Sequence, residues 1–382
     1  MHRCSKASWP PVVLSAALLL AAAVPARAQE EKTAKAPEID VVICLDVSSS
    51  MQGLFGSAKL KLWDIVNDLG KVEPTPNLRV GLYSYGHGSY DDRAGWVRKE
   101  IDLTTDLDEV SRKLSALTIR GNEVYVTRVC RDALRDQKWS EDKKALRVLF
   151  VCGNQSATQD AKVPLREVVE LAAKKDVVIN AIFCGPPNHR DAADWKRLAG
   201  MTKGHFAGIN QNLSTVAVST PHDKEIAELS KKLSATYVPY GKEGHDRSLN
   251  QKVQDDNAYR TSPETGAARG AFKAGYLYRC ESWDLVDRLK NDPNFDVKKV
   301  PDEDLTAELR KMKPAEREKY VREMLDKREA LQKQIVELNQ KREEHLRDAL
   351  KKNPSKADRV FDEAVRGSLR EQGAAKGIKV PD

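Results

Sequence analysis

The chain has 382 residues, of which 40% are hydrophobic and 32% are charged, so it can form one sizeable core and solvated extensions. Its formal net charge is +7, of which +3 lies in a segment that we expect to be removed, and the remaining +4 is spread among many acids. No basic block with interleaved aromatic residues occurs, which argues against a nucleic acid partner.

The first 28 residues have the three parts of an export signal. Arg3 and Lys6 provide a positive n-region, and residues 12–24 form an apolar h-region that is too short to span a bilayer. Small residues at positions 26 and 28 then form a cleavage site. We predict cleavage after Ala28 and an exported mature chain, periplasmic or secreted, without a transmembrane segment. An uncleaved anchor is the alternative.

Alternating strand and helix signals follow a short charged linker at residues 29–37. Residues 39–46 are apolar and β-branched, as expected for a strand that is buried on both faces. The sequence then predicts, in order, a helix at 58–70, a strand hairpin at 78–85 and 96–103, helices at 107–117 and 124–136, a strand at 145–152, a helix at 163–175, a strand at 177–184, a helix at 192–200, a short strand at 204–209 and a closing helix at 223–235.

This alternation predicts a doubly wound α/β fold, in which a mostly parallel sheet carries helices on both faces. Ligands of such folds bind at the carboxyl ends of the strands, where the strand order reverses. The ends of the predicted strands 39–46 and 145–152 are therefore the places to search for a site.

The sequence changes character after residue 236. Residues 237–301 mix Gly, Pro, Asn and aromatic residues, which predicts an irregular extension. Residues 302–352 are mostly charged and predict a long amphipathic helix, while residues 353–382 predict a helix and a flexible tail. The apolar positions close to heptad spacing in the long helix are Val321, Met324, Leu331, Ile335, Leu338 and Leu346. Arg328 interrupts that seam, so a single helix and a coiled coil both remain open.

A polar motif ends the first predicted strand. Residues 46–50 read Asp-Val-Ser-Ser-Ser, the pattern D-x-S-x-S. One carboxylate and two hydroxyls at this spacing can converge on a hard cation such as Mg²⁺, which prefers oxygen ligands. The motif alone is weak, because Asp and Ser before a helix are more often N-caps. Its place at the ligand-binding edge of the predicted sheet favours a site.

With this motif at this place, the chain resembles the von Willebrand factor A (VWA) domain family over roughly residues 38–236. The resemblance implies a metal-ion-dependent adhesion site, to which the family adds a threonine from a Gly-Gly-Thr loop and an aspartate at the end of the fourth strand. This sequence has Glu123 in the loop and Cys152 at the aspartate position. Cys152 is too soft a ligand for Mg²⁺, whereas Glu123 restores the missing charge. The expected metal ligands are Asp46, Ser48, Ser50 and Glu123.

Two interpretations of this site stay open: a bound Mg²⁺ or Mn²⁺, or a degenerate site that only packs and caps the next helix. No His pair has the spacing of a zinc helix, and neither a G-x-S-x-G elbow nor a phosphate-binding loop occurs. Cys152 has no base placed beside it in the sequence. We therefore expect a binding module and not an enzyme, with no catalytic residue.

Our first hypothesis is a cell-envelope module whose VWA domain binds a protein partner, with an acidic residue of the partner completing the coordination of the cation. The alternative is a metal-independent structural or assembly protein that acts through its C-terminal helix. That helix is also a candidate for forming homo-oligomers.

Five cysteines remain after the predicted cleavage, so at least one thiol is free or bonded to another chain. Cys152 and Cys184 end two strands that we expect to be neighbours. A disulfide bond between them requires Cβ atoms about 4 Å apart, which a sequence does not reveal.

Overall fold

The structure of the chain is a computed structural model that describes residues 36–56, 65–66, 68–209, 219–352 and 356–380. The predicted export signal and most of the helix predicted at 58–70 lie outside these residues.

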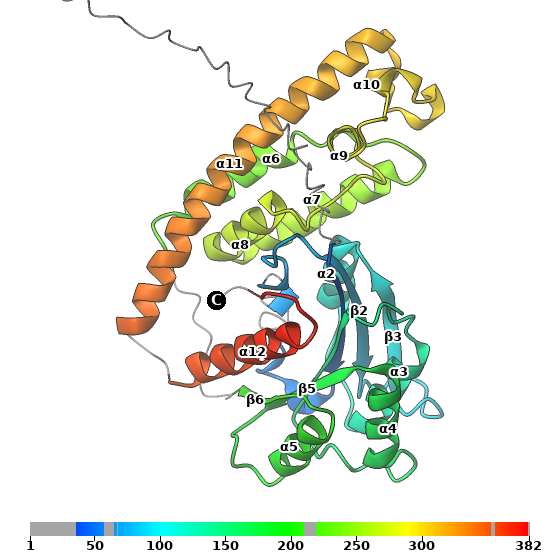
Figure 1. The fold of residues 1–382 in the computed structure, drawn as a ribbon, viewed down its shortest axis with the longest axis vertical. Helices are drawn as coiled ribbons and strands as arrows, with labels where there is room; N and C mark the ends of the chain where they lie inside the picture. The colour runs from blue at the N-terminus through cyan, green and yellow to red at the C-terminus, as the bar shows by residue number, and fades with distance from the viewer. Residues whose placement is uncertain (1–35, 57–64, 67, 210–218, 353–355, 381–382) are drawn as a thin grey trace, which may run out of the picture. The chain divides into compact units, whose positions relative to one another are not determined.

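Six strands form one sheet with the order β3-β2-β1-β4-β5-β6 (Figure 1). They are β1 (Glu38–Asp46), β2 (Asn77–Tyr85), β3 (Val97–Thr104), β4 (Leu146–Gly153), β5 (Val178–Cys184) and β6 (Phe206–Ile209). Only β3 is antiparallel to its neighbour, as the predicted hairpin requires. Every residue of β4 is buried, which explains its apolar sequence. The predicted doubly wound, mostly parallel α/β fold is confirmed.

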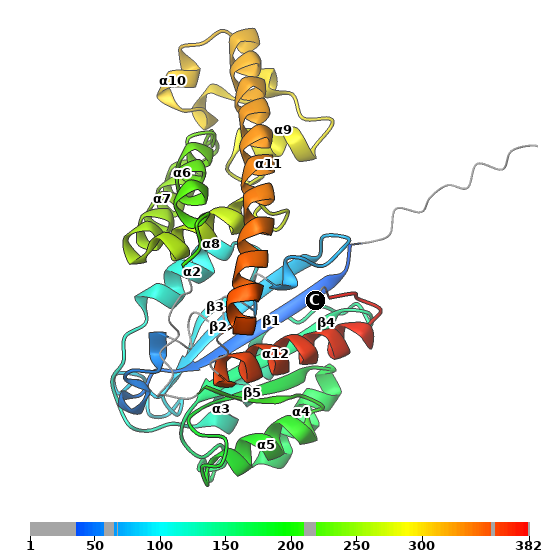
Figure 2. The same ribbon diagram turned by 90° about the vertical axis from the view of Figure 1, so that its left-hand side faces the viewer.

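Helices cover both faces of this sheet (Figure 2). Helices α3 (Val126–Asp136), α4 (Leu165–Lys175) and α5 (Ala192–Met201) contribute to the apolar core of one face. The core of the other face includes side chains from α2 (Leu107–Ala116) and from α12 (Lys356–Ala374), the last helix of the chain. Residues more than 300 positions apart in sequence, such as Ile43 and Leu369, thus belong to one core.

The helix predicted to close the domain does not pack on the sheet. Helix α6 (Asp223–Ser234) forms near its predicted place, but it packs against α8 (Pro263–Ala274) and α11 (Pro314–Lys352). Helix α12 lies beside β6 instead, and Ile378 and Val380 beyond it are buried in the core. The prediction of a loose tail was therefore wrong for these residues, because their apolar side chains find a partner surface on the sheet.

The prediction of an irregular extension at 237–301 was also wrong. This segment contains α7 (Gly244–Thr261), α8 and α9 (Leu285–Asn291). The buried side of α7 is polar and consists of Gly244, Ser248, Gln251, Gln254 and Asp255. Apolar periodicity therefore cannot reveal this helix. Its Gln254 accepts from Ser111 of α2, its Asp255 accepts from Ser234 of α6, and its Gln251 donates to the Tyr278 hydroxyl after α8.

The long charged helix starts later than the predicted residue 302. The 3₁₀ turns Val297–Lys299 and Asp302–Asp304 and the short helix α10 (Ala307–Arg310) come first, and α11 begins at Pro314. Proline is favoured in the first turn, where its missing N–H costs no hydrogen bond. Three apolar positions of α11, at Val321, Met324 and Ile335, are buried within the same chain. These three positions are not available to a second copy, and oligomerisation through this helix stays a prediction.

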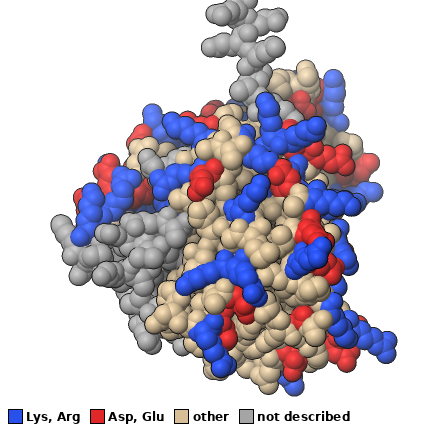
Figure 3. All heavy atoms as spheres, turned by 60° about the horizontal axis from the view of Figure 1, so that its bottom comes forward, with Lys and Arg blue, Asp and Glu red and all other residues tan. Residues whose placement is uncertain are grey.

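The high charge content of the chain is distributed over its surface. Lys and Arg side chains are interspersed with Asp and Glu on the face shown in Figure 3. Many form pairs one helical turn apart, such as Arg322 with Glu318 at 2.7 Å on α11 and Arg166 with Glu170 at 2.7 Å on α4. Among the helices of the described ranges, none combines the length and apolar character of a membrane span.

Candidate functional site

The D-x-S-x-S motif lies at the carboxyl end of β1, at the centre of the sheet. Strand β1 is hydrogen-bonded to β2 on one side and to β4 on the other, so the strand order reverses at this strand. The motif is therefore at the position where doubly wound folds bind their ligands. A short 3₁₀ turn (Ser49–Met51) follows the strand and places the serines.

Hydroxyl and amide oxygens from two loops meet above the end of β1. The Oγ atoms of Ser48 and Ser50 are 2.9 Å apart. The Ser50 hydroxyl donates to Asn154 Oδ1 at 2.8 Å, and Asn154 Nδ2 donates to the Ser50 carbonyl at 2.8 Å. Asn154 follows β4 and was not among the four predicted ligands. Its reciprocal bonds with Ser50 join the two strand ends on either side of the switch point.

Asp46 lies beneath these oxygens and is completely buried. Its Oδ1 accepts the Ser48 N–H at 2.8 Å, but its Oδ2 has no hydrogen-bond partner among the described residues. A Cβ atom at Gly153 would lie 2.6 Å from the Tyr85 hydroxyl and 3.0 Å from Oδ2, so this position favours glycine. Burial raises the pKa of Asp46 from 3.8 to about 6, although the Ser48 N–H, the Ser48 hydroxyl and the Asn154 N–H oppose this shift.

The loop at residues 120–123 is held against the motif by its backbone. The Ser49 N–H donates to the Gly121 carbonyl at 2.7 Å, and the Gly121 N–H donates to Ser49 Oγ at 3.1 Å. Gly121 has a φ of +111° and approaches the backbone of Gly88 too closely for a side chain. Glu123 is exposed on this loop and forms no hydrogen bond with Asp46, Ser48 or Ser50 in the described part of the chain. Its role as a metal ligand stays a prediction.

The donor set fits a hard divalent cation in its chemistry but has little negative charge. Ser48, Ser50 and Asn154 would hold the ion, and the unpaired oxygen of Asp46 would supply negative charge from below. The ion would supply a positive charge that binds an anionic group. No group of three His, Cys, Asp or Glu residues in the described ranges could hold a metal. Cys152, at the aspartate position, is buried in the core with its Sγ 3.3 Å from that of Cys184.

Replacing Asp46 with Asn should separate the stability of the fold from cation binding. A buried acid whose pKa is raised stabilises the fold below pH 3.8 and loses this contribution as the pH rises through about 6. Asp46→Asn cannot ionise, so without metal at pH 7 it should be more stable than the wild type by on the order of 3 kcal/mol. Urea unfolding at pH 4 and pH 7 measures the difference.

The exposed Asp92, changed to Asn, is the control and should leave stability within about 0.5 kcal/mol. Millimolar Mn²⁺ should raise the melting temperature of the wild type and of Asp92→Asn, but not that of Asp46→Asn. A metal-free Asp46→Asn protein that is less stable than the wild type at pH 7 would contradict the expectation.

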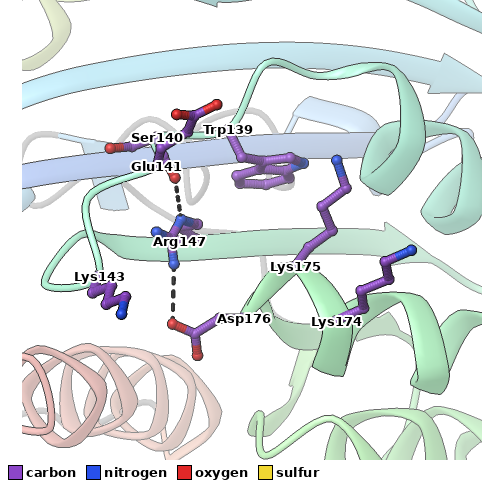
Figure 4. Close-up of a pocket in the computed structure, with 8 residues that line it drawn as sticks. All are labelled: Trp139, Ser140, Glu141, Lys143, Arg147, Lys174, Lys175 and Asp176. Atoms are coloured by element: carbon purple, nitrogen blue, oxygen red, sulfur yellow. Dashed lines mark hydrogen bonds and ion pairs between the residues drawn. The ribbon is translucent and has the colours of Figure 1, made fainter.

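A cavity of about 500 Å³ lies at the opposite end of the sheet, near the starts of β4 and β5 (Figure 4). Its lining residues are Trp139, Ser140, Glu141, Lys143, Arg147, Lys174, Lys175 and Asp176. The central Arg147 donates to the Ser140 carbonyl at 2.7 Å and to Asp176 at 3.0 Å. The cavity lies away from the polar motif, and its arginine is already paired within the protein.

Comparison with known proteins agrees with this architecture. The sequence profile of the von Willebrand factor type A domain matches residues 40–238, slightly more than half of the chain. Among curated proteins, none matches the sequence. Similar solved structures include proximal thread matrix protein 1 from the mussel byssus, at 17% identity and a TM-score of 0.36. That match covers 46% of this chain and 43% of the mussel protein. Another structure of the mussel protein has a zinc-occupied metal-ion-dependent adhesion site (MIDAS) motif.

Two further structures show the same range of similarity. The SpRpn10 VWA domain is 18% identical with a TM-score of 0.35, over 45% of this chain and 88% of that one. A von Willebrand factor type A protein from Catenulispora acidiphila is 14% identical with a TM-score of 0.35, over 46% of this chain and 39% of that one. The profile match, the six-stranded sheet and the position of D-x-S-x-S lead to one conclusion. The chain belongs to the von Willebrand factor type A domain family.

Proposed function

We propose that this chain is an exported binding protein of the cell envelope, and that its VWA domain holds a protein partner at the carboxyl edge of the sheet with the help of Mg²⁺ or Mn²⁺. VWA domains commonly mediate interactions between proteins. The observation that supports the cation most directly is the cluster of Ser48, Ser50 and Asn154 oxygens above a buried carboxylate whose Oδ2 has no partner. A buried, unpaired acid is costly unless a proton or a cation compensates it.

The low charge of the site indicates what kind of partner group it takes. One carboxylate offsets only half of the charge of a divalent ion, and hard cations accept further carboxylate ligands. An acidic side chain of the partner would complete the charge balance. Within the chain, Glu123 on the adjacent loop is exposed and is the acid that we predict as a second carboxylate ligand of the cation.

The site supports binding better than catalysis. Ser48 and Ser50 are hydrogen-bonded to each other and to Asn154, and neither forms a hydrogen bond with a His or Lys side chain among the described residues. Cys152 is fully buried, so a substrate cannot reach its thiol. The alternative of a module that acts through α11 has less support, because three apolar positions of that helix are buried within the chain.

Calorimetric titration with Mn²⁺ tests the ligand set. Ser50→Ala removes one oxygen and one of the two hydrogen bonds between Ser50 and Asn154, and should weaken Mn²⁺ binding by at least roughly tenfold. Glu123→Gln should weaken binding far more than Cys152→Ser, measured on reduced protein. Glu141→Gln, which removes an exposed acid at the other end of the sheet, is the matched control and should bind like the wild type.

The partner is tested by pull-down from envelope extract, with the wild type and with Ser50→Ala, in Mg²⁺ and in chelator. Proteins that are captured only in Mg²⁺ and only by the wild type support the proposal. If the wild type shows no heat with Mn²⁺ and captures the same proteins in chelator, the cation has no role in this protein.

A further inference from the structure

Two thiols meet in the core directly below the candidate site. The Sγ atoms of Cys152 and Cys184 are 3.3 Å apart. Cys152 lies at the end of β4 and Cys184 at the end of β5, and these parallel strands are hydrogen-bonded neighbours. Cys152 is paired in register with Ile182, so Cys184 is two residues further along β5 and its side chain is on the same face of the sheet.

We propose that Cys152 and Cys184 form a disulfide bond in the oxidised, mature protein. The two thiols lose two electrons and two protons as the Sγ–Sγ bond forms. A disulfide oxidant, such as oxidised glutathione or a dithiol oxidase, takes up both electrons and both protons and is released as two thiols. The exported location proposed above provides such oxidants, whereas the pairing itself follows from the geometry of the sheet.

The other cysteines are less suited to this bond. The remaining described ones are Cys44, Cys130 and Cys280, and all three are buried. Cys44 and Cys130 belong to the core on the opposite face of the sheet, and Cys280 follows α8 in the helical extension. Among the five described thiols, Cys152 and Cys184 are the pair whose Sγ atoms are in hydrogen-bond contact. A bond of about 2.05 Å requires that these two atoms approach by about 1.3 Å and that the two Cβ atoms lie about 4 Å apart.

Burial determines when the bond can form. Both side chains are completely inaccessible to solvent in the folded chain. An oxidant therefore reaches them while β4 and β5 are still separate, during folding, and the folded reduced protein should react slowly. Once formed, the bond joins the two strand ends directly before Gly153 and Asn154. The Tyr85 hydroxyl, which donates to the Cys152 carbonyl at 2.9 Å, holds the same strand end from the other side.

The test is refolding of the full chain in a mixture of reduced and oxidised glutathione, followed by alkylation of free thiols and peptide mapping. The chain has six cysteines, so the reduced protein should take up six labels and the refolded protein four. The linked peptides should contain Cys152 and Cys184. The melting temperature should rise by roughly 5 °C relative to the reduced protein.

Matched variants identify the bond. Cys280→Ser should still form it, whereas Cys152→Ala and Cys184→Ala should each leave the other thiol free for alkylation. The same peptide map of wild-type chain recovered from a bacterial periplasm avoids dependence on refolding yield. Six labels in the refolded full chain and five in the periplasmic chain cleaved after Ala28, or a link between any other pair, would overturn the proposal. Because the map does not involve metal, its result is independent of the Mn²⁺ titration and of the search for a partner.

Discussion

A chain that ends after residue 352 should lose the cooperative fold of its α/β domain, although the family match ends at residue 238. The missing segment carries four side chains that are at most 8% exposed and belong to the core on one face of the sheet. They are Val365, Leu369, Ile378 and Val380. Burial of such a side chain contributes about 1.5–3 kcal/mol, so their loss removes roughly 6–12 kcal/mol, which is comparable to the whole stability of a domain.

A buried polar pair adds to this effect. Gln372 on α12 donates to Asn180 Oδ1 at 2.8 Å and accepts from Asn180 Nδ2 at 3.1 Å. Truncation leaves the β5 amide without this partner and exposes the apolar face of the sheet. Circular dichroism during heating should show no sharp transition for the truncated chain, and a dye that binds exposed apolar surface should fluoresce strongly.

Point variants of α12 give a graded test within the full chain. Leu369→Ala should cost about 2–5 kcal/mol in urea unfolding, because Leu369 is 1% exposed. Glu371→Ala alters an exposed residue of the same helix, whose partner His205 is also at the surface, and should change stability by less than about 1 kcal/mol. If the truncated chain melts at the wild-type temperature, α12 does not belong to the domain core.

Arg328→Ala should destabilise the helical extension by about 3–5 kcal/mol. Arg328 is completely buried, and its Nη1 contacts Asp284 at 2.5 Å and Asp287 at 2.6 Å. Its Nη2 also donates to the Thr236 carbonyl at 2.7 Å, and its guanidinium lies 3.9 Å from the centre of the Tyr237 ring. One side chain of α11 thus joins α9 to the segment after α6. Removing it leaves two buried carboxylates without their cation.

The loss of stability caused by Arg328→Ala should depend on pH. Burial already raises the pKa of Asp284, although Arg328 opposes the shift, and removing the arginine should raise this pKa further. An acid with a raised pKa contributes stability at low pH and loses it as the pH rises, so the deficit should be larger at pH 8 than at pH 5. Urea unfolding at both pH values measures this change.

Two variants accompany Arg328→Ala. Arg322→Ala, which removes an exposed arginine paired with Glu318 on the same helix, should cost less than about 1 kcal/mol. Combining Arg328→Met with Asp284→Asn and Asp287→Asn removes all three charges and should recover part of the loss. Equal effects of Arg322→Ala and Arg328→Ala would show that the buried charges do not stabilise the extension.

Local patterns were sufficient for most of the sheet and for the position of the D-x-S-x-S motif at its edge. Residues 39–46 are buried at every position and apolar at all but Asp40 and Asp46, because both faces of the strand are covered. Such a run identifies a central parallel strand without knowledge of its neighbours. The order of strands and helices then specifies the doubly wound fold. D-x-S-x-S places Asp46, Ser48 and Ser50 together because these residues are adjacent in the chain.

Contacts between distant residues were beyond the reach of these patterns. Both α6 and α12 carry an apolar face, but only α12 contributes to the core on the sheet. Which of the two helices packs there depends on the fit of surfaces in three dimensions. Asn154 lies 104 positions from Ser50, and their reciprocal bonds exist only once β1 and β4 are neighbours. Arg328 interrupts an apolar seam in the sequence, yet Asp284 and Asp287 make its burial favourable. In each case the sequence shows the type of side chain or helix, but only the packing of the whole chain determines which distant residues it contacts.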